Sequence, residues 1–321
     1  MTRDTLEHHQ IPLYFAAVLL AGAFGLLAPS LAQGLGALVT PAIAVLMYAM
    51  FLQIPFLDLR QGLGHKRFLS ALLLANFILV PLLVWVLTRG LVERPALLVG
   101  ALLVLLTPCI DYVVVFTHIG KGDSRLMLAA TPVLLLLQLL LLPVYLGLML
   151  GAQSGVVVQA GPFIEAFLLL IVLPMGLAVI TTFLARRSSG VSAWSDAWAW
   201  LPVPAMALVL VVVIGSQITS VVRDINLLLP VIPVYVAFLL LAPVIGALAA
   251  RLFALPAATA RAVTFSASTR NSLVVLPLAL ALPEDVRGVA ATAVILQTLV
   301  ELVGELIYVR LIPRLVWPAG R

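Results

Sequence analysis

The chain has 321 residues, of which 64% are hydrophobic and only 10% are charged. A soluble globular domain carries about 25% charged residues, so this composition excludes an ordinary soluble fold and predicts an all-α polytopic membrane protein. The formal net charge is +5, and in a membrane protein such an excess reflects topology, so we predict no nucleic-acid partner.

Ten apolar segments are each long enough to cross the roughly 30 Å hydrocarbon core of a bilayer. Charged residues, glycine and proline bound these segments. The first segment lacks a convincing signal-cleavage pattern, so we predict that it is retained. In chain order, the predicted spans are 11–29, 36–57, 68–88, 96–119, 126–150, 161–184, 198–219, 228–252, 258–282 and 288–312.

The positive charges predict the orientation of these spans. If the N-terminus is cytoplasmic, the inner segments hold most of the 18 lysine and arginine residues, as the positive-inside rule requires. We therefore predict a multi-pass protein of the cell inner (plasma) membrane, with both termini in the cytoplasm. The lipid bilayer is then the main partner of its surface. The sequence also permits a homodimer.

Ten spans divide into five and five, and an odd number of spans reverses the orientation of the second half. The sequence therefore predicts two inverted five-helix repeats, 1–155 and 156–321, within one integral membrane unit. The equivalent fourth and ninth spans are both interrupted by polar residues, as TPCID (107–111) and SASTRNS (266–272). Broken helices in matching positions indicate a transporter whose binding site lies near the bilayer midplane.

Arg270 lies in the ninth-span interruption, where a charge costs roughly 2.5 to 3.5 kcal/mol on insertion scales and needs a partner. Asp111, in the fourth span, is the candidate partner. One interpretation is an ion pair that only locks crossed helices; the other is a substrate site in which Asp111 also exchanges a proton. Asn76, in the third span, is interpreted as interhelical hydrogen-bond glue.

Cys109 is the one cysteine of the chain, which excludes an intrachain disulfide and a multi-cysteine metal cage. It is either a small buried hydrophobe or a functional thiol, whose soft sulfur favours soft metal centres. The sequence has no glycine-rich phosphate loop, HExxH or GxSxG motif. We therefore predict that the protein is not an enzyme and has no cofactor.

Glu301 and Glu305 share one face of the tenth span, because four residues separate them. We expect Glu305 near the inner interface, where it snorkels or pairs with Arg310. Glu301 is deeper, and we interpret it as a second proton carrier or a partner for charge in the core.

These segments resemble the bile acid:sodium symporter superfamily and, within it, the arsenite permeases of arsenical resistance. CIDYVVVFTHIGKGD (109–123) is similar to the family's cysteine followed by a KGD or RGD turn, with Cys109 on the permeases' characteristic cysteine. FSASTRNS (265–272) resembles the polar crossover, with Asn271 on a shared asparagine, and TLVEL (298–302) resembles the permeases' tenth span. The resemblance implies a panel domain and a core domain that holds broken, crossed helices 4 and 9.

The departures from this resemblance concern the coupling ion. Val113 and Val114 stand where sodium-coupled members place hydroxyl and amide ligands, and Ser266 and Arg270 stand where those members place a glutamate and a glutamine. The resemblance therefore implies no sodium site, with Arg270 supplying the charge of the missing ion. Leu273 stands where the permeases carry a ninth-span glutamate.

We expect a secondary active transporter that extrudes arsenite or antimonite from the cytoplasm by exchange with protons. Cys109 would contact the metalloid, Asp111, Arg270 and Asn271 would complete the substrate site, and Asp111 and Glu301 are the candidate proton carriers. The alternative is a symporter of an organic anion, a bile-acid-like carboxylate or sulfonate that binds Arg270. The broken helices disfavour a scaffold or sensor that does not transport.

Overall fold

The computed structural model describes residues 10–53, 64–110, 112–150, 165, 168–223 and 225–316. Regular structure within these ranges is helical, apart from one isolated bridge between Pro108 and Arg270. Three shorter apolar helices cover Pro12–Leu27, Pro95–Leu105 and Leu173–Ala185. Six helices are long and apolar enough to cross a membrane: Gly36–Gln53, Lys66–Leu91, Ser124–Leu150, Pro202–Arg223, Ile232–Leu252 and Val286–Leu315.

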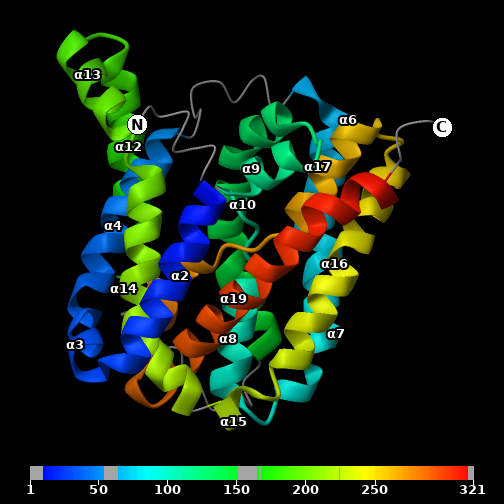
Figure 1. Ribbon diagram of the computed structural model, residues 1–321. Coiled ribbons are helices and arrows are strands. Elements are labelled where there is room, and N and C mark those ends of the chain that lie inside the picture. Colours follow the sequence, from blue (N-terminus) through cyan, green and yellow to red (C-terminus); the bar gives the residue numbers. More distant parts are fainter. Residues whose placement is uncertain are drawn as a thin grey trace. The chain divides into compact units, whose positions relative to one another are not determined.

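The chain forms two compact units, and the first takes its described residues from 1–53 and 159–227. Within this unit α14 packs beside α2 and α4, and α12 packs against α4 (Figure 1). The Thr219 hydroxyl donates a 3.0 Å hydrogen bond to the Gly25 carbonyl, which ties α14 to α2. The helices of this unit are α2 (Gln10–Leu27), α3 (Pro29–Gly34), α4 (Gly36–Gln53), the π-helix η4 (Leu168–Val172), α12 (Leu173–Ala185), α13 (Ser189–Trp198) and α14 (Pro202–Arg223).

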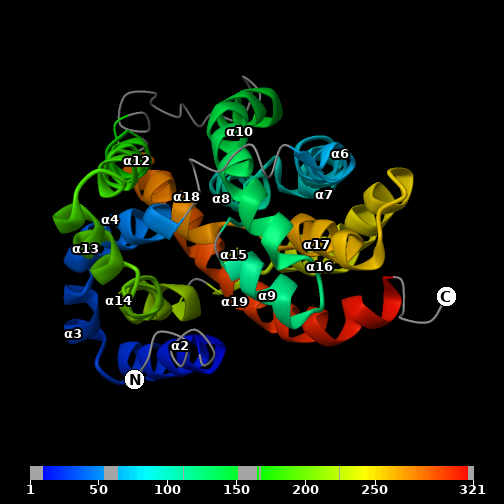
Figure 2. The ribbon, with the colours of Figure 1, turned by 90° about the horizontal axis from the view of Figure 1, so that it is seen from above.

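The second unit takes its described residues from 54–158 and 228–321. Within it α19 packs against α8 and α18, and α16 lies beside α17 (Figures 1 and 2). Its helices are α6 (Lys66–Leu74), the π-helix η2 (Ala75–Leu79), α7 (Val80–Leu87), the 3-10 helix η3 (Thr88–Leu91), α8 (Pro95–Leu105), α9 (Tyr112–Ile119), α10 (Ser124–Leu150), α16 (Ile232–Leu252), α17 (Ala257–Ser268), α18 (Ser272–Leu280) and α19 (Glu284–Leu315).

Each compact unit combines segments from both halves of the chain, and α15 (Ile225–Leu228) spans the boundary between them in sequence. The units are therefore a different division from the predicted repeats 1–155 and 156–321. Those inverted repeats, and the full set of ten spans, stay a prediction.

Both helix interruptions occur where the sequence predicts them, between α8 and α9 and between α17 and α18. At the first, Pro108 has no N–H to donate and disfavours a helical conformation for the residue before it. At the second, the hydroxyls of Ser268 and Thr269 donate to the carbonyls of Thr264 and Phe265, at 2.5 and 2.7 Å. The Phe265 carbonyl also accepts from the Thr269 amide at 3.0 Å. Side-chain bonds of this kind in the last turn compete with the main-chain pattern and favour the end of the helix.

The third apolar segment contains a π-helix, η2, which ends two residues before Pro81. Because Pro81 lacks an N–H, the Phe77 carbonyl loses its usual helical donor. The Tyr145 hydroxyl donates to this carbonyl at 2.6 Å and replaces that bond. A π-bulge of this kind often marks a functional site, and Asn76 lies within it.

Gly100 allows α8 and α19 to approach closely. A Cβ atom at Gly100 would lie 2.6 Å from the carbonyl oxygen of Ala290 and 3.0 Å from its Cα. Gly100→Ala should therefore lower the free energy of unfolding by about 1 to 3 kcal/mol, the usual range for overpacking. The control is Gly288→Ala on α19, where a Cβ meets nothing within 4 Å and should raise stability by about 0.4 to 1 kcal/mol. Thermal unfolding of both variants in detergent measures the difference, and equal midpoints would contradict the prediction.

Candidate functional site

The two interruptions pair with each other through their main chains. The amide of Cys109 donates to the carbonyl of Thr269 at 3.1 Å, and the amide of Asn271 donates to the carbonyl of Thr107 at 2.9 Å. An unsatisfied backbone group in hydrocarbon costs several kcal/mol. The exchange therefore supplies partners that each broken helix has lost, and it brings Cys109, Arg270 and Asn271 together. We call the paired segments 107–110 and 268–271 the crossover.

Arg270 is buried, with 0% of its surface exposed. Its Nη2 donates to Asn76 Oδ1 at 2.8 Å and to the Ser266 carbonyl at 2.6 Å. The guanidinium carbon lies 5.5 Å from the centre of the Phe238 ring, within the range of a cation–π contact. Nε has no hydrogen-bond partner among the described residues. The guanidinium is thus fixed in place, while Nε remains without an acceptor within this set.

Asn76 accepts a hydrogen bond from Arg270, and its own position is fixed by two further hydrogen bonds. Its Nδ2 donates to Ser266 Oγ at 3.0 Å and to the Leu72 carbonyl at 3.1 Å. The interpretation of Asn76 as interhelical glue is therefore confirmed, and its partner is the cation at the crossover.

Glu301 brings a carboxylate to the crossover from α19. The main-chain amide of Arg270 donates to both carboxylate oxygens, at 3.1 Å to Oε1 and 3.0 Å to Oε2. The Tyr112 hydroxyl donates to Oε1 at 2.7 Å, and Gln297 Nε2 donates to Oε2 at 2.5 Å. Glu301 is only 3% exposed, so these bonds replace water around the carboxylate.

The hydroxyl of Tyr112 lies within hydrogen-bond distance of two acceptors. It is 2.7 Å from Glu301 Oε1 and 2.8 Å from the Arg270 carbonyl. A phenol has one O–H donor and can also accept. When Glu301 is ionised, Tyr112 can donate to it; when Glu301 is protonated, the carboxyl can donate to Tyr112 while Tyr112 donates to Arg270. The Glu301 carboxyl therefore has a hydrogen-bond partner in Tyr112 in either protonation state.

Glu305 lies deeper than expected. It has 0% exposure, and Oε1 lies 2.7 Å from the Thr269 hydroxyl, whose one O–H can donate either to this oxygen or to the Phe265 carbonyl. The expectation that Glu305 snorkels or pairs with Arg310 is therefore wrong. At 100° per residue, the side chains of Glu305 and Arg310 leave α19 about 140° apart. Glu305 faces the crossover. Its Oε2 has no hydrogen-bond partner within the described part of the chain.

Two further predicted residues line the crossover. Cys109 is buried, and its role as a metalloid ligand stays a prediction. Asn271 Oδ1 accepts a 3.2 Å bond from the Val274 amide and caps α18, so this side chain has a structural role at the helix start. Asp111 lies outside the described residues, so its pairing with Arg270 and its proton role stay predictions.

Sequence reasoning missed Tyr112 and Gln297 as partners of Glu301. Gln297 precedes Glu301 by four residues on α19, a spacing that places both on one helix face, so this partner could have been found. Tyr112 could not, because its contact depends on how α9 meets α19 in space.

The chain matches the family model described as Sodium Bile acid symporter family over residues 40–224, which is more than half of its length. No curated protein matches the chain. The matched stretch includes Asn76 and Cys109, whereas Arg270 and Glu301 follow it. With its apolar helices and its broken, paired crossover, this multi-pass membrane transporter belongs to the Sodium Bile acid symporter family.

Proposed function

We propose that this transporter extrudes arsenite or antimonite in exchange for protons and does not use sodium. The observation that carries the proposal is the buried guanidinium of Arg270, held at the crossover by Asn76 and the Ser266 carbonyl. A second unit charge about 4 Å away is repelled by roughly 4 kcal/mol at an effective dielectric constant of 20. A fixed cation here therefore opposes sodium binding and replaces its charge.

The proposal has two candidate proton carriers, Glu301 and Asp111, and the structure describes the contacts of Glu301. Transport by exchange requires a group that is protonated on one side of the membrane and ionised on the other. The hydroxyl of Tyr112, shared between Glu301 and the Arg270 carbonyl, can satisfy the carboxyl in either state. Asp111 is the second candidate carrier, by its position in the sequence.

Cys109 is the proposed metalloid ligand. Its thiol would attack arsenous acid, forming one S–As bond and breaking one As–O bond, while the thiol proton leaves with the hydroxide as water. Hydrolysis of the S–As bond restores the thiol and releases the cargo. One thiol makes one such bond, which suits a transient site. Because Cys109 is buried, a conformational change has to expose it before binding.

A second candidate substrate is an organic anion. The observation in its favour is Arg270 Nε, which has no hydrogen-bond partner among the described residues. A carboxylate or sulfonate could accept from this donor. However, Nη2 is already engaged by Asn76 and Ser266, so the paired donors that usually hold a carboxylate are not both available.

Cys109→Ser is expected to abolish arsenite resistance in cells that depend on this protein, because an oxygen ligand binds trivalent arsenic far more weakly than sulfur. The measurement is arsenite accumulation with and without the protein, repeated after the proton gradient is collapsed and after sodium is removed. We expect extrusion to require the proton gradient and to be unaffected by sodium.

Membrane insertion of Cys109→Ser is the control, since serine is nearly the same size as cysteine. An organic-anion carrier would retain uptake of its substrate in this variant. Full resistance in Cys109→Ser would refute the metalloid site, and a sodium requirement would refute the role given to Arg270.

A further inference from the structure

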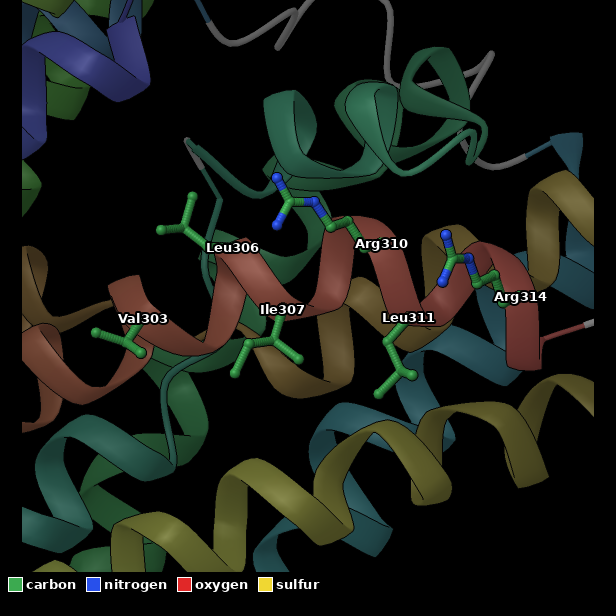
Figure 3. A pocket seen from close by; sticks show the side chains of 6 residues that line it. All are labelled: Val303, Leu306, Ile307, Arg310, Leu311 and Arg314. Atoms are coloured by element: carbon green, nitrogen blue, oxygen red, sulfur yellow. The ribbon is translucent and has the colours of Figure 1, made fainter.

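The face of α19 opposite the crossover carries an apolar groove. Its volume is about 410 Å³, and in Figure 3 the guanidinium groups of Arg310 and Arg314 extend from the same edge of the helix. The aliphatic residues of the groove are exposed. The lining residues are Val303, Leu306, Ile307, Arg310, Leu311 and Arg314.

A second cavity, of 290 Å³, continues from this groove. Both share Arg310 and Arg314, and the second adds Lys121 and Arg261. No aspartate or glutamate is among the described residues that line either one. The apolar groove thus ends in a basic cavity.

The basic cavity has a fixed wall. Arg261 is buried and donates to the carbonyls of Val316, Lys121 and Pro313 at 3.2, 3.3 and 3.2 Å. These bonds join α17 to the turn before α10 and to the end of α19. Lys121 has a φ of 56° in that turn. Arg310 and Arg314, by contrast, have exposed side chains that reach the opening of the cavity.

The dimensions of the groove fit one leaflet of a bilayer. From Val303 to Arg314 the helix rises roughly 16 Å, at 1.5 Å per residue. This is about half of the roughly 30 Å hydrocarbon core. The apolar part can therefore lie beside an acyl chain while the arginines are level with the headgroups.

We propose that this groove and cavity form a binding site for an anionic phospholipid. An acyl chain lies along Val303, Ile307 and Leu311, and the headgroup phosphate is bound by Arg310, Arg314 and Lys121. The positive-inside distribution of the sequence assigns these cations to the cytoplasmic side, where anionic lipids are attracted by basic pockets between helices. A second copy of the chain is the poorer occupant, because it would bring the same arginines together across a symmetric interface.

The test is native mass spectrometry of the full-length protein with phosphatidylglycerol and phosphatidylcholine of equal chain length. We expect wild-type protein to retain phosphatidylglycerol preferentially. Arg310→Gln/Arg314→Gln should reduce this preference about tenfold or more, since each basic residue near the surface contributes on the order of 1 kcal/mol. The matched control is Arg186→Gln/Arg187→Gln, which removes the same charge from the end of α12 and should keep the preference.

Three outcomes would overturn the proposal. Equal binding of both lipids by the wild-type protein would overturn the proposal, whether or not the double variant folds. An unchanged preference in Arg310→Gln/Arg314→Gln would show that the cations bind no headgroup. A double variant that alters only the ratio of dimer to monomer would assign the face to a second copy of the chain.

Discussion

Glu301→Gln is expected to stop proton-driven arsenite extrusion while leaving the protein inserted and folded. Glutamine preserves the size of the side chain and can still accept from the Arg270 amide and the Tyr112 hydroxyl, but it cannot carry a proton. Loss of a positioned proton-transfer group commonly reduces a rate by about a hundredfold or more. The measurement is arsenite uptake into everted vesicles after a pH step, with the amount of inserted protein determined in parallel.

Glu93→Gln is the matched control for this experiment, because Glu93 is exposed and has no contact with the crossover. It should transport as the wild type does. Should Glu301→Gln also retain the wild-type rate and its dependence on the pH step, Glu301 cannot be the proton carrier. Asp111 would then be the remaining candidate of the two predicted from the sequence.

Arg270→Ala is expected to destabilise the second unit and to abolish transport. The substitution leaves Asn76 Oδ1 and the Ser266 carbonyl without their donor, and it removes the cation near the Glu301 carboxylate. Breaking a buried charge interaction typically lowers stability by about 3 to 5 kcal/mol. Thermal unfolding in detergent, followed at several pH values, measures this loss.

The control for Arg270→Ala is Arg94→Ala, which removes an exposed arginine at the start of α8 and should leave the unfolding temperature within about 1 °C of wild type. If Arg270→Ala were as stable as Arg94→Ala, the guanidinium would not be compensating buried charge. If added sodium restored the transport that Arg270→Ala has lost, this rescue would support the proposal that Arg270 replaces that ion.

Much of the fold follows from local sequence. Apolar runs predict helices in a membrane because backbone polar groups must be satisfied within the segment, and TPCID and SASTRNS predict both interruptions. The π-helix at Ala75–Leu79 was not predicted. It depends on the Tyr145 hydroxyl satisfying the carbonyl that Pro81 leaves without a donor, and that contact joins residues 68 positions apart.

The sequence predicts the two helix interruptions that form the candidate site, but it predicts the positions of the surrounding side chains less well. Cys109, Arg270 and Asn271 come together because the two interruptions exchange main-chain hydrogen bonds. Glu305 was misplaced because its depth depends on the length and tilt of α19, which extends over Glu284–Leu315. Spacing alone identifies the helix face that a residue shares, but it does not determine how far along the membrane normal that residue lies.

The crossover is joined by bonds between backbone atoms, from Cys109 to Thr269 and from Asn271 to Thr107. A main-chain bond does not depend on which side chain its residue carries. The side chains at these four positions can therefore change without removing the bonds that hold the two broken helices together.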